Sequence, residues 1–198
     1  MSNIWFTSDL HMWHANILKY NPNRPYNSVE QMNEGLIVNW NSVVKAKDTV
    51  YVLGDFSFAG RSVELYSNRL NGNKKIVFGN HDPGHPYNKH YKKAVKRGEP
   101  EYWNKFYADH GWEVLPLEYE LNIEGVAKVV LSHMPYDCED PRYVDYIPKD
   151  KGLFLLHGHT HSLEKIKGRQ IHVGTDAWNC TPVHIDQIKE IILNAKNS

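Results

Sequence analysis

The chain has 198 residues, enough for one domain with a sizeable core, and its 23 basic and 23 acidic side chains give a formal net charge of zero. This balance excludes a strong overall field for nucleic acid or an acidic membrane. The sequence has no long apolar run or signal-like N-terminus, so we expect one cytoplasmic domain over residues 1–198 without membrane association. Cys138 and Cys180 predict free thiols rather than a disulfide.

Five short apolar runs, rich in β-branched or aromatic residues, predict buried strands. They lie at 4–6, 49–53, 75–78, 129–131 and 153–156. A polar segment directly follows each run, in the order Asp9-Leu10-His11, Gly54-Asp55, Gly79-Asn80-His81-Asp82, Ser132-His133 and Gly158-His159-Thr160-His161. Because strands that end along one edge of a layered α/β fold bring distant loops together, seven oxygen or nitrogen donors should converge there.

A helix is predicted between the first two strands. Ser28-Val29-Glu30-Gln31 has the pattern of a capping box, which marks a helix start. Apolar side chains then recur at helical spacing, at Val29, Met32, Leu36, Trp40 and Val43 or Val44. This face should pack on the sheet as scaffold.

The segment from Asp82 to about Gly111 mixes cations with aromatic residues. These are Lys89, Lys92, Lys93, Lys96 and Arg97, with Tyr87, Tyr91, Tyr102 and Trp103 among them. Such a mixture can stack bases and meet phosphates. Tyr91, Ala94 and Val95 also fit one face of a short, solvated helix, and we favour this second interpretation because charge runs usually mark solvated faces. As an insertion beside the Gly79–Asp82 loop, the segment can still shape substrate choice.

The later half of the sequence is β-rich. Short runs at 117–123, 127–131, 170–173 and 183–185 predict further strands, with a hairpin turn at Glu124-Gly125. A loop rich in Pro, Asp and Tyr extends from 135 to 148, directly after His133. Long loops of this kind often form a lid or a wall beside a site.

The residue types of the polar segments indicate metal chemistry. Imidazole and carboxylate without thiolate suit Mn²⁺, Fe or Zn²⁺, and a carboxylate such as Asp55 can bridge two cations. Paired cations about 3.5–4 Å apart can clamp a phosphoryl group and lower the pKa of a shared water. The nucleophile would then be a metal-bridging hydroxide, and no Ser or Cys nucleophile is needed.

In this order, the motifs resemble those of the calcineurin-like metallophosphoesterase superfamily from the first strand to the final segment. The resemblance implies a four-layer α/β/β/α sandwich of two mixed β-sheets flanked by helices. After Gly54-Asp55 the chain continues Phe56-Ser57-Phe58-Ala59-Gly60, where the protein Ser/Thr phosphatases have a further Asp-Arg-Gly. It is more similar to the small, stand-alone bacterial and phage phosphoesterases, which end in a segment like Val173-Gly174-x-Asp176-x-Trp178-Asn179.

The resemblance also implies roles for single residues. Asp9, His11 and His161 would bind one metal, Asn80, His133 and His159 would bind the other, and Asp55 would bridge them. His81 would contact the phosphate and protonate the leaving oxygen. Asp82 would orient His81, and Asn80 would help to hold charge on the phosphorane. Mn²⁺ is our first expectation for both metals, with Fe, Zn²⁺ or Ni²⁺ as alternatives.

Two residues outside the motifs are candidates for substrate contact. His14 lies three residues after His11 and can bind a phosphate or base, or be a surface histidine. Arg24 can contact phosphate with two nitrogens, although an arginine that holds its own loop is an equal alternative. His157 should point away from the metals because side chains alternate along a strand. The default for His85, His90, His110, His172 and His184 is a surface or satisfied core histidine.

Three functions follow from the sequence. The preferred one is a hydrolase of small, nucleotide-like phosphoesters, with diesters favoured over monoesters. The second is a nuclease on DNA or RNA, for which the segment of cations and aromatic residues is the support. The third is a scaffold that binds metal without turnover. The complete donor set and His81 favour catalysis over the scaffold.

Overall fold

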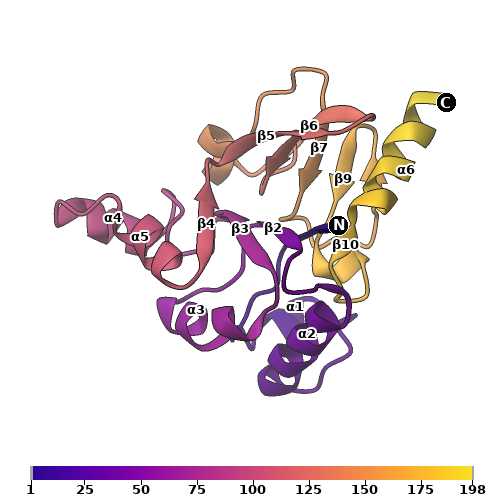
Figure 1. Cartoon of the computed structure of the whole chain (residues 1–198). Helices are drawn as coiled ribbons and strands as arrows, with labels where there is room; N and C mark the ends of the chain where they lie inside the picture. The colour runs from indigo at the N-terminus through magenta and orange to yellow at the C-terminus, as the bar shows by residue number, and fades with distance from the viewer. Residues whose placement is uncertain (1, 198) are drawn as a thin grey trace.

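The computed structural model describes residues 2–197, which form two five-stranded mixed β-sheets with helices around them (Figure 1). The first sheet has the strand order β10-β1-β2-β3-β4. Its strands are β1 (Ile4–Thr7), β2 (Thr49–Leu53), β3 (Asn73–Val77), β4 (Trp112–Leu115) and β10 (Val183–His184). β1 to β4 run parallel, and only β10 is antiparallel to its neighbour. The carboxyl ends of β1, β2 and β3 therefore meet along one edge.

The second sheet has the strand order β5-β6-β7-β9-β8. Its strands are β5 (Glu118–Ile123), β6 (Ala127–Ser132), β7 (Phe154–His157), β8 (Ile166–Lys167) and β9 (Gln170–His172). β5 and β6 form the predicted hairpin, in which Ile123 pairs with Ala127. β6, β7 and β9 run parallel, so the segments after β6 and β7 also leave at a common edge.

Helices flank the two sheets. The helices are α1 (Ile17–Tyr20), α2 (Val29–Val43), α3 (Gly60–Tyr66), α4 (Lys89–Lys96), α5 (Tyr102–Asp109) and α6 (Ile185–Asn197). Short 3-10 turns are η1 (Ser67–Arg69), η2 (Pro141–Tyr146) and η3 (Thr175–Ala177). One apolar cluster joins Met32, Leu36 and Trp40 of α2 to Val50 and Val52 of β2. α2 begins as predicted, because the Ser28 hydroxyl accepts from the Gln31 N–H at 3.2 Å.

A second apolar cluster fills the space between the two sheets. Phe6 and Leu53 of the first sheet meet Val129 and Leu156 of the second, and Ile188 of α6 joins them. α6 packs on β10 and β1, at the end of the first sheet that lies opposite β4. The predicted α/β class with two mixed sheets flanked by helices is confirmed. Because the packed sheets cannot shift, their loops are held in a fixed relation.

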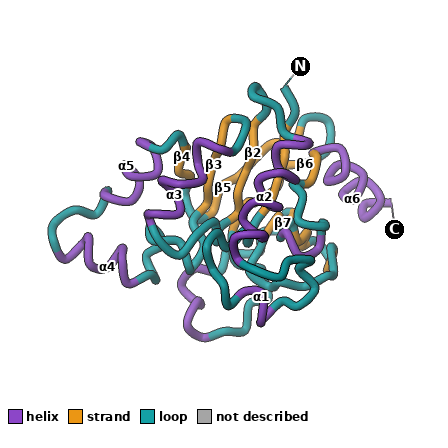
Figure 2. Tube along the Cα trace, turned by 90° about the horizontal axis from the view of Figure 1, so that it is seen from below, coloured by secondary structure: helices purple, strands orange, loops and turns teal. Residues whose placement is uncertain are grey.

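The segment from Asp82 to Gly111 forms two helices rather than irregular chain. Both views place α4 at the far end of the molecule, away from both sheets (Figures 1 and 2). Within α4, Ala94 is buried and the lysines are exposed, as the solvated-helix interpretation predicts. Val95 departs from that interpretation, because 43% of it is exposed.

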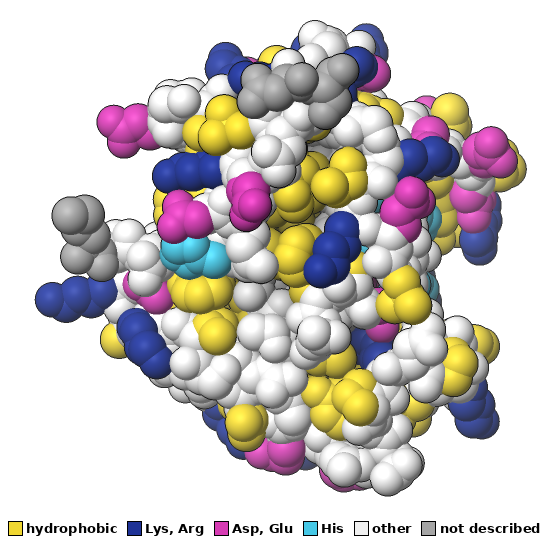
Figure 3. Space-filling view, turned by 90° about the vertical axis from the view of Figure 1, so that its right-hand side faces the viewer, with side chains coloured by type: hydrophobic (Ala, Val, Ile, Leu, Met, Phe, Trp, Pro, Cys, Tyr) yellow, Lys and Arg dark blue, Asp and Glu magenta, His cyan; other side chains and the backbone are white. Residues whose placement is uncertain are grey.

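The surface mixes charges of both signs. Figure 3 shows the face that carries α6, where Lys and Arg side chains lie among Asp and Glu. None of the helices in residues 2–197 combines the length and apolar character needed to cross a membrane. Cys138 and Cys180 are both free, so the predicted free thiols are confirmed.

Candidate metal centre

The loops after β1 and β2 continue side by side beyond the ends of their strands. The Asp9 N–H donates to the Gly54 carbonyl at 3.0 Å, and the His11 N–H donates to the Asp55 carbonyl at 2.9 Å. From the second sheet, the Thr175 N–H donates to the Ser8 carbonyl at 3.0 Å. These backbone bonds fix the donor side chains before any ligand is present.

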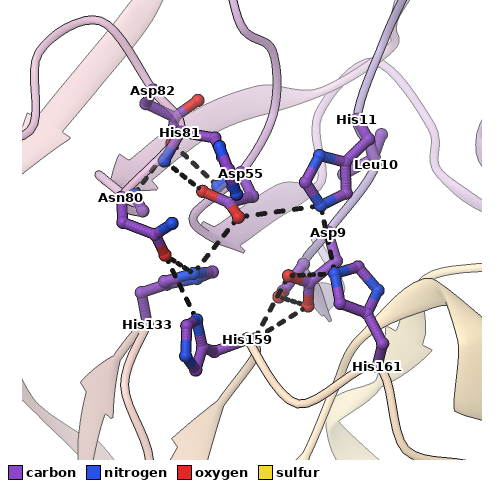
Figure 4. A network of polar contacts seen from close by, with 12 residues as sticks. Asp9, Leu10, His11, Asp55, Asn80, His81, Asp82, His133, His159 and His161 are labelled. Atoms are coloured by element: carbon purple, nitrogen blue, oxygen red, sulfur yellow. Dashed lines mark hydrogen bonds and ion pairs between the residues drawn. The ribbon is translucent and has the colours of Figure 1, made fainter. Parts of the chain in front are cut away.

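Five of the seven predicted metal ligands have a left-handed backbone. The φ angles are 58° at Asp9, 51° at His11, 53° at Asp55, 70° at His159 and 51° at His161. Asp and His adopt this region more often than most non-glycine residues, but it still carries strain. Left-handed residues turn the chain sharply, and here the turns aim the side chains from several loops at one point (Figure 4).

Asp9, His11 and His161 form what we name the first donor group. One ligand atom from each lies within 4.8 Å of the others. His11 Nε2 is 3.2 Å from His161 Nε2, and His161 Nε2 is 3.9 Å from Asp9 Oδ1. Ser8 Oγ and the His159 N–H donate to the Asp9 carboxylate, the latter at 3.1 Å to both oxygens. The predicted ligands of one metal are thus brought together.

Asn80, His133 and His159 form the second donor group. Asn80 Oδ1 lies 3.1 Å from both His133 Nε2 and His159 Nδ1. Asn80 Nδ2 donates to Tyr143 Oη at 3.2 Å, which turns the amide oxygen toward the imidazoles. The predicted ligands of the other metal are therefore together as well, and Tyr143 brings the 135–148 loop against them as a wall.

Asp55 lies between the two groups. Its Oδ2 is 3.6 Å from His11 Nε2 and 3.4 Å from His133 Nε2 (Figure 4). The other oxygen, Oδ1, accepts from the His81 N–H at 2.9 Å. Asp9, Asp55 and His133 also offer ligand atoms within 4.8 Å of one another, so Asp9 lies near both groups. The position of Asp55 is the one a bridging carboxylate needs.

Hydrogen bonds at the far ring nitrogens orient two of the histidines. His133 Nδ1 donates to the Leu53 carbonyl at 2.8 Å, and His161 Nδ1 donates to Asp176 Oδ2 at 2.7 Å. In each ring this leaves Nε2 facing the donor group, the usual arrangement of metal-binding histidines. Sequence reasoning did not assign a role to Asp176, although its segment was part of the resemblance.

Arg24 is buried beneath the first donor group. Its Nε donates to Asp176 Oδ1 at 2.8 Å, and its Nη2 donates to the Asp9 carbonyl at 2.6 Å. Nη1 donates to the Leu10 carbonyl at 3.2 Å. The side chain is fully buried, so the expectation of a phosphate contact is corrected, and Arg24 instead holds its surroundings together.

Asp82 holds backbone rather than the His81 ring. Its Oδ2 accepts from the N–H groups of Asp55 and Gly79, both at 2.8 Å, and its Oδ1 accepts from the Ser57 N–H at 3.1 Å. This corrects the expectation that Asp82 orients His81. Burial and the neighbouring Asp55 charge raise the pKa of Asp82 to about 7. Asp82 thus ties the loop after β2 to the loop after β3.

His81 lies at the rim of the centre. Its ring centroid is 5.5 Å from that of His11 and 4.3 Å from that of Phe58. His14 lies on the other side of Phe58, with 4.1 Å between the ring centroids, and 6.4 Å from His81. The two predicted substrate-side histidines are therefore neighbours, and Phe58 is an additional residue that sequence reasoning did not single out.

Burial keeps most of these imidazoles neutral. It lowers the pKa of His14 and of His159 to about 4, and that of His11 well below its ordinary value. His133 and His161 differ, because nearby carboxylates outweigh burial. Asp55 raises the pKa of His133 to about 9, and Asp9 and Asp176 raise the pKa of His161 above its ordinary value. Neutral imidazoles beside buried carboxylates are the forms that bind cations.

The donor set fits divalent cations. The two groups offer imidazole nitrogens, carboxylate oxygens and one amide oxygen, a combination that suits borderline and hard divalent ions.

Two remaining predictions concern nearby histidines. His157 is buried, and its Nδ1 donates to the Gly158 carbonyl at 2.9 Å. His172 lies beside it, with 5.5 Å between the ring centroids. His157 is thus a buried residue outside both donor groups.

Comparison with known proteins identifies the class of fold and site. The sequence model of the calcineurin-like phosphoesterases matches residues 2–163. The chain belongs to this family, which consists of metal-dependent phosphoester hydrolases that typically use two divalent metals. The resemblance seen in the motifs is confirmed.

Individual relatives come from phages and an archaeon. The Gene 66 protein of Mycobacterium phage D29 is 36% identical over 204 residues, which cover 97% of this chain and 96% of that protein. An uncharacterized protein of Methanocaldococcus jannaschii is 31% identical over 207 residues, covering 99% and 94% of the two chains. A crystal structure of a protein of unknown function from Aquifex aeolicus has a TM-score of 0.70 at 23% identity, with 97% and 100% coverage, and supports the fold.

Proposed function

We propose that this chain is a phosphodiesterase that hydrolyses small, nucleotide-like substrates with two divalent cations, Mn²⁺ being the preferred metal. One observation carries the proposal: Asp55 Oδ2 lies 3.6 Å from His11 and 3.4 Å from His133, which belong to different donor groups. A carboxylate in this position can hold two cations close enough to act on one phosphoryl group. Family membership supports phosphoester hydrolysis as the reaction.

The residues of the chain have distinct tasks in this proposal. Asp9, His11 and His161 would hold one cation, Asn80, His133 and His159 would hold the other, and Asp55 lies between them, where it would contact both. When bound, the two cations supply a water of lowered pKa and positive charge for the phosphoryl oxygens. Asn80 helps to stabilise negative charge on the phosphorane, and His81 gives a proton to the leaving oxygen.

The charge of the side chains near the donor groups supports a preference for diesters. A monoester dianion carries one more negative charge than a diester and needs an additional cationic group nearby. Arg24, the arginine nearest in sequence to the first loop, is buried in bonds to Asp176 and backbone carbonyls. The imidazole of His14 is neutral at ordinary pH, because burial lowers its pKa to about 4. Neither of these two side chains offers a positive charge to a phosphoryl group at the metals, which favours a singly charged diester.

The test compares hydrolysis of bis-p-nitrophenyl phosphate with that of p-nitrophenyl phosphate at matched Mn²⁺. We expect the diester to be the better substrate, and His81→Ala to lower turnover while the protein still binds metal. The matched control is His110→Ala, directly after α5 and outside both donor groups, which should retain full turnover. Preference for the monoester would change the assignment to a phosphatase. Absence of turnover with Mn²⁺, Ni²⁺, Fe²⁺ and Zn²⁺ would favour the scaffold.

A further inference from the structure

A cavity of about 570 Å³ opens on the His81 side of the metal centre. We name it the basic pocket. It is lined by Phe58, Asn80, His81, Tyr87, Asn88, Lys89, His90 and Lys92. Two of these, Asn80 and His81, belong to the centre itself, so a molecule bound at the metals extends directly into the pocket. Its volume is in the range of sites that bind small molecules of nucleotide size.

Hydrogen bonds join the pocket to the Gly79–Asp82 loop of the metal centre. Asn88 precedes α4, and its Oδ1 accepts from the His90 N–H at 2.9 Å. The Asn88 side-chain amide donates to the His81 carbonyl at 2.9 Å. The start of α4 is therefore fixed to the backbone of His81, although the rest of the helix extends away from both sheets (Figures 1 and 2). The first turn, which carries Lys89 and Lys92, is thus held beside the loop that contains His81.

Some lysines of the surface pair with carboxylates, whereas the two lysines of the pocket have no such partner in the described part of the chain. Lys75, Lys128, Lys151 and Lys167 each pair with a carboxylate at 2.5–3.0 Å. Across residues 2–197, no carboxylate lies within 4.0 Å of the Lys89 or Lys92 ammonium group. The pKa of His90, which also lines the pocket, is lowered by burial and by the charges of Lys89 and of the neighbouring Lys93. Positive charge is thus concentrated in the pocket and is free to bind an anion.

Aromatic side chains form the other part of the lining. Phe58 lies beside His81, with 4.3 Å between the ring centroids, and Lys92 Nζ is 4.9 Å from the ring centroid of Tyr87. Aromatic walls with nearby cations suit a base followed by a phosphate. A solvated helix face explains Lys93 and Lys96, which are outside the lining, but leaves the placement of Lys89 and Lys92 beside the catalytic loop unexplained.

We propose that the basic pocket binds a nucleoside leaving group that carries a second phosphate, so that Lys89 and Lys92 select substrates with a terminal phosphate next to the scissile diester. This inference rests on the proposed function, because His81 is placed on the leaving-group side by that proposal. The cleaved bond and the phosphate held by the lysines are then separated by one nucleoside.

The experiment measures kcat/KM for three dinucleotides with Mn²⁺: ApA, pApA and ApAp, which carry no terminal phosphate, a 5′ one or a 3′ one. We expect at least one phosphorylated form to exceed ApA by tenfold or more. Lys89→Gln/Lys92→Gln should abolish this ratio. The matched control Lys93→Gln/Lys96→Gln removes the same charge from the same helix, outside the pocket, and should keep the ratio.

A binding measurement keeps the inference separate from the proposed function. Titration calorimetry of the metal-loaded protein should show adenosine 3′,5′-bisphosphate binding at least tenfold more tightly than adenosine 5′-monophosphate, and this difference should disappear only in Lys89→Gln/Lys92→Gln. Equal affinities, or equal losses in both double variants, would overturn the pocket assignment. If the affinities differ as expected but no diester is hydrolysed, the pocket stands and the proposed reaction is rejected.

Discussion

The two donor groups of the metal centre are supported in different ways. Behind the first group, His161 donates to Asp176, which pairs with the fully buried Arg24. Behind the second group, His133 donates to the Leu53 carbonyl, and Asn80 is turned by Tyr143. One group thus depends on a buried ion pair and the other on neutral hydrogen bonds.

Because their supports differ, the two donor groups should differ in how strongly substitutions affect them. A buried charge left without its partner costs far more than a neutral donor left without its acceptor. The first donor group should therefore be sensitive to changes some distance from the metal. The second should be affected mainly by loss of its own ligands.

The largest effect is expected where the two groups meet. Asp55→Ala removes the carboxylate that lies between His11 and His133, and so should abolish metal binding at both donor groups. Metal content per chain, measured by mass spectrometry after gel filtration, should fall from two to near zero, and turnover should fall to that of metal-stripped protein. Asp109→Ala, exposed on α5, is the control and should retain two metals. Retention of two metals by Asp55→Ala would contradict the bridging position.

The next effect concerns the buried ion pair. Arg24→Met leaves the Asp176 carboxylate buried without its cation, and should lower the free energy of unfolding by about 3–5 kcal/mol. Denaturant titration of metal-free protein measures this. Arg142→Met, which removes a pair on the surface, should leave the unfolding midpoint where it is. A similar midpoint in both variants would show that the charged support is unimportant.

Asp176→Asn should weaken metal binding by the first donor group alone. The amide keeps the size of the side chain but loses the charge that orients His161. Loss of such an outer partner typically lowers metal affinity about 10–100-fold. Calorimetric titration with Mn²⁺ should show one of the two binding events weakened by that factor, with the other retained. Equal weakening of both events would mean that the groups are not independent.

The smallest effect is expected from Tyr143→Phe. The variant removes the hydroxyl that accepts from Asn80 while the buried ring remains. Loss of one neutral hydrogen bond costs about 0.5–1.5 kcal/mol, so one Mn²⁺ affinity should change less than about tenfold. Tyr102→Phe, on exposed α5, provides the baseline for the same calorimetric titration. A loss larger than that of Asp176→Asn would reverse the proposed difference between the two groups.

The sequence predicts the donor residues much better than it predicts the residues that hold them in place. Each donor follows an apolar run within a few residues, so local pattern and strand order are enough to bring it to the edge of the sheet. The contact of Arg24 with Asp176 joins residues 152 positions apart, and nothing local distinguishes it from a surface arginine. Asp82 was misassigned for a related reason, since its neighbour His81 suggested a partner, whereas the folded loops supply three backbone N–H groups.

The same limit applies to the segment between Asp82 and Gly111. Its charge pattern predicts a solvated helix, and α4 is one. Sequence alone does not show that Asn88 fastens the first turn of this helix to the His81 backbone. In the folded chain the Asn88 side-chain amide donates to the carbonyls of both Asn80 and His81, and the helix that it precedes brings two lysines to the pocket beside them.

The distribution of the donors along the chain has a consequence for biosynthesis. The first half of the polypeptide contains Asp9, His11, Asp55 and Asn80, but the imidazoles that complete both groups emerge only with residues 133, 159 and 161. The bonds from Ser8 to Thr175 and from Leu53 to His133 form only once the second sheet has closed on the first. A chain that ends before residue 133 therefore lacks three of the predicted ligands and can assemble neither donor group.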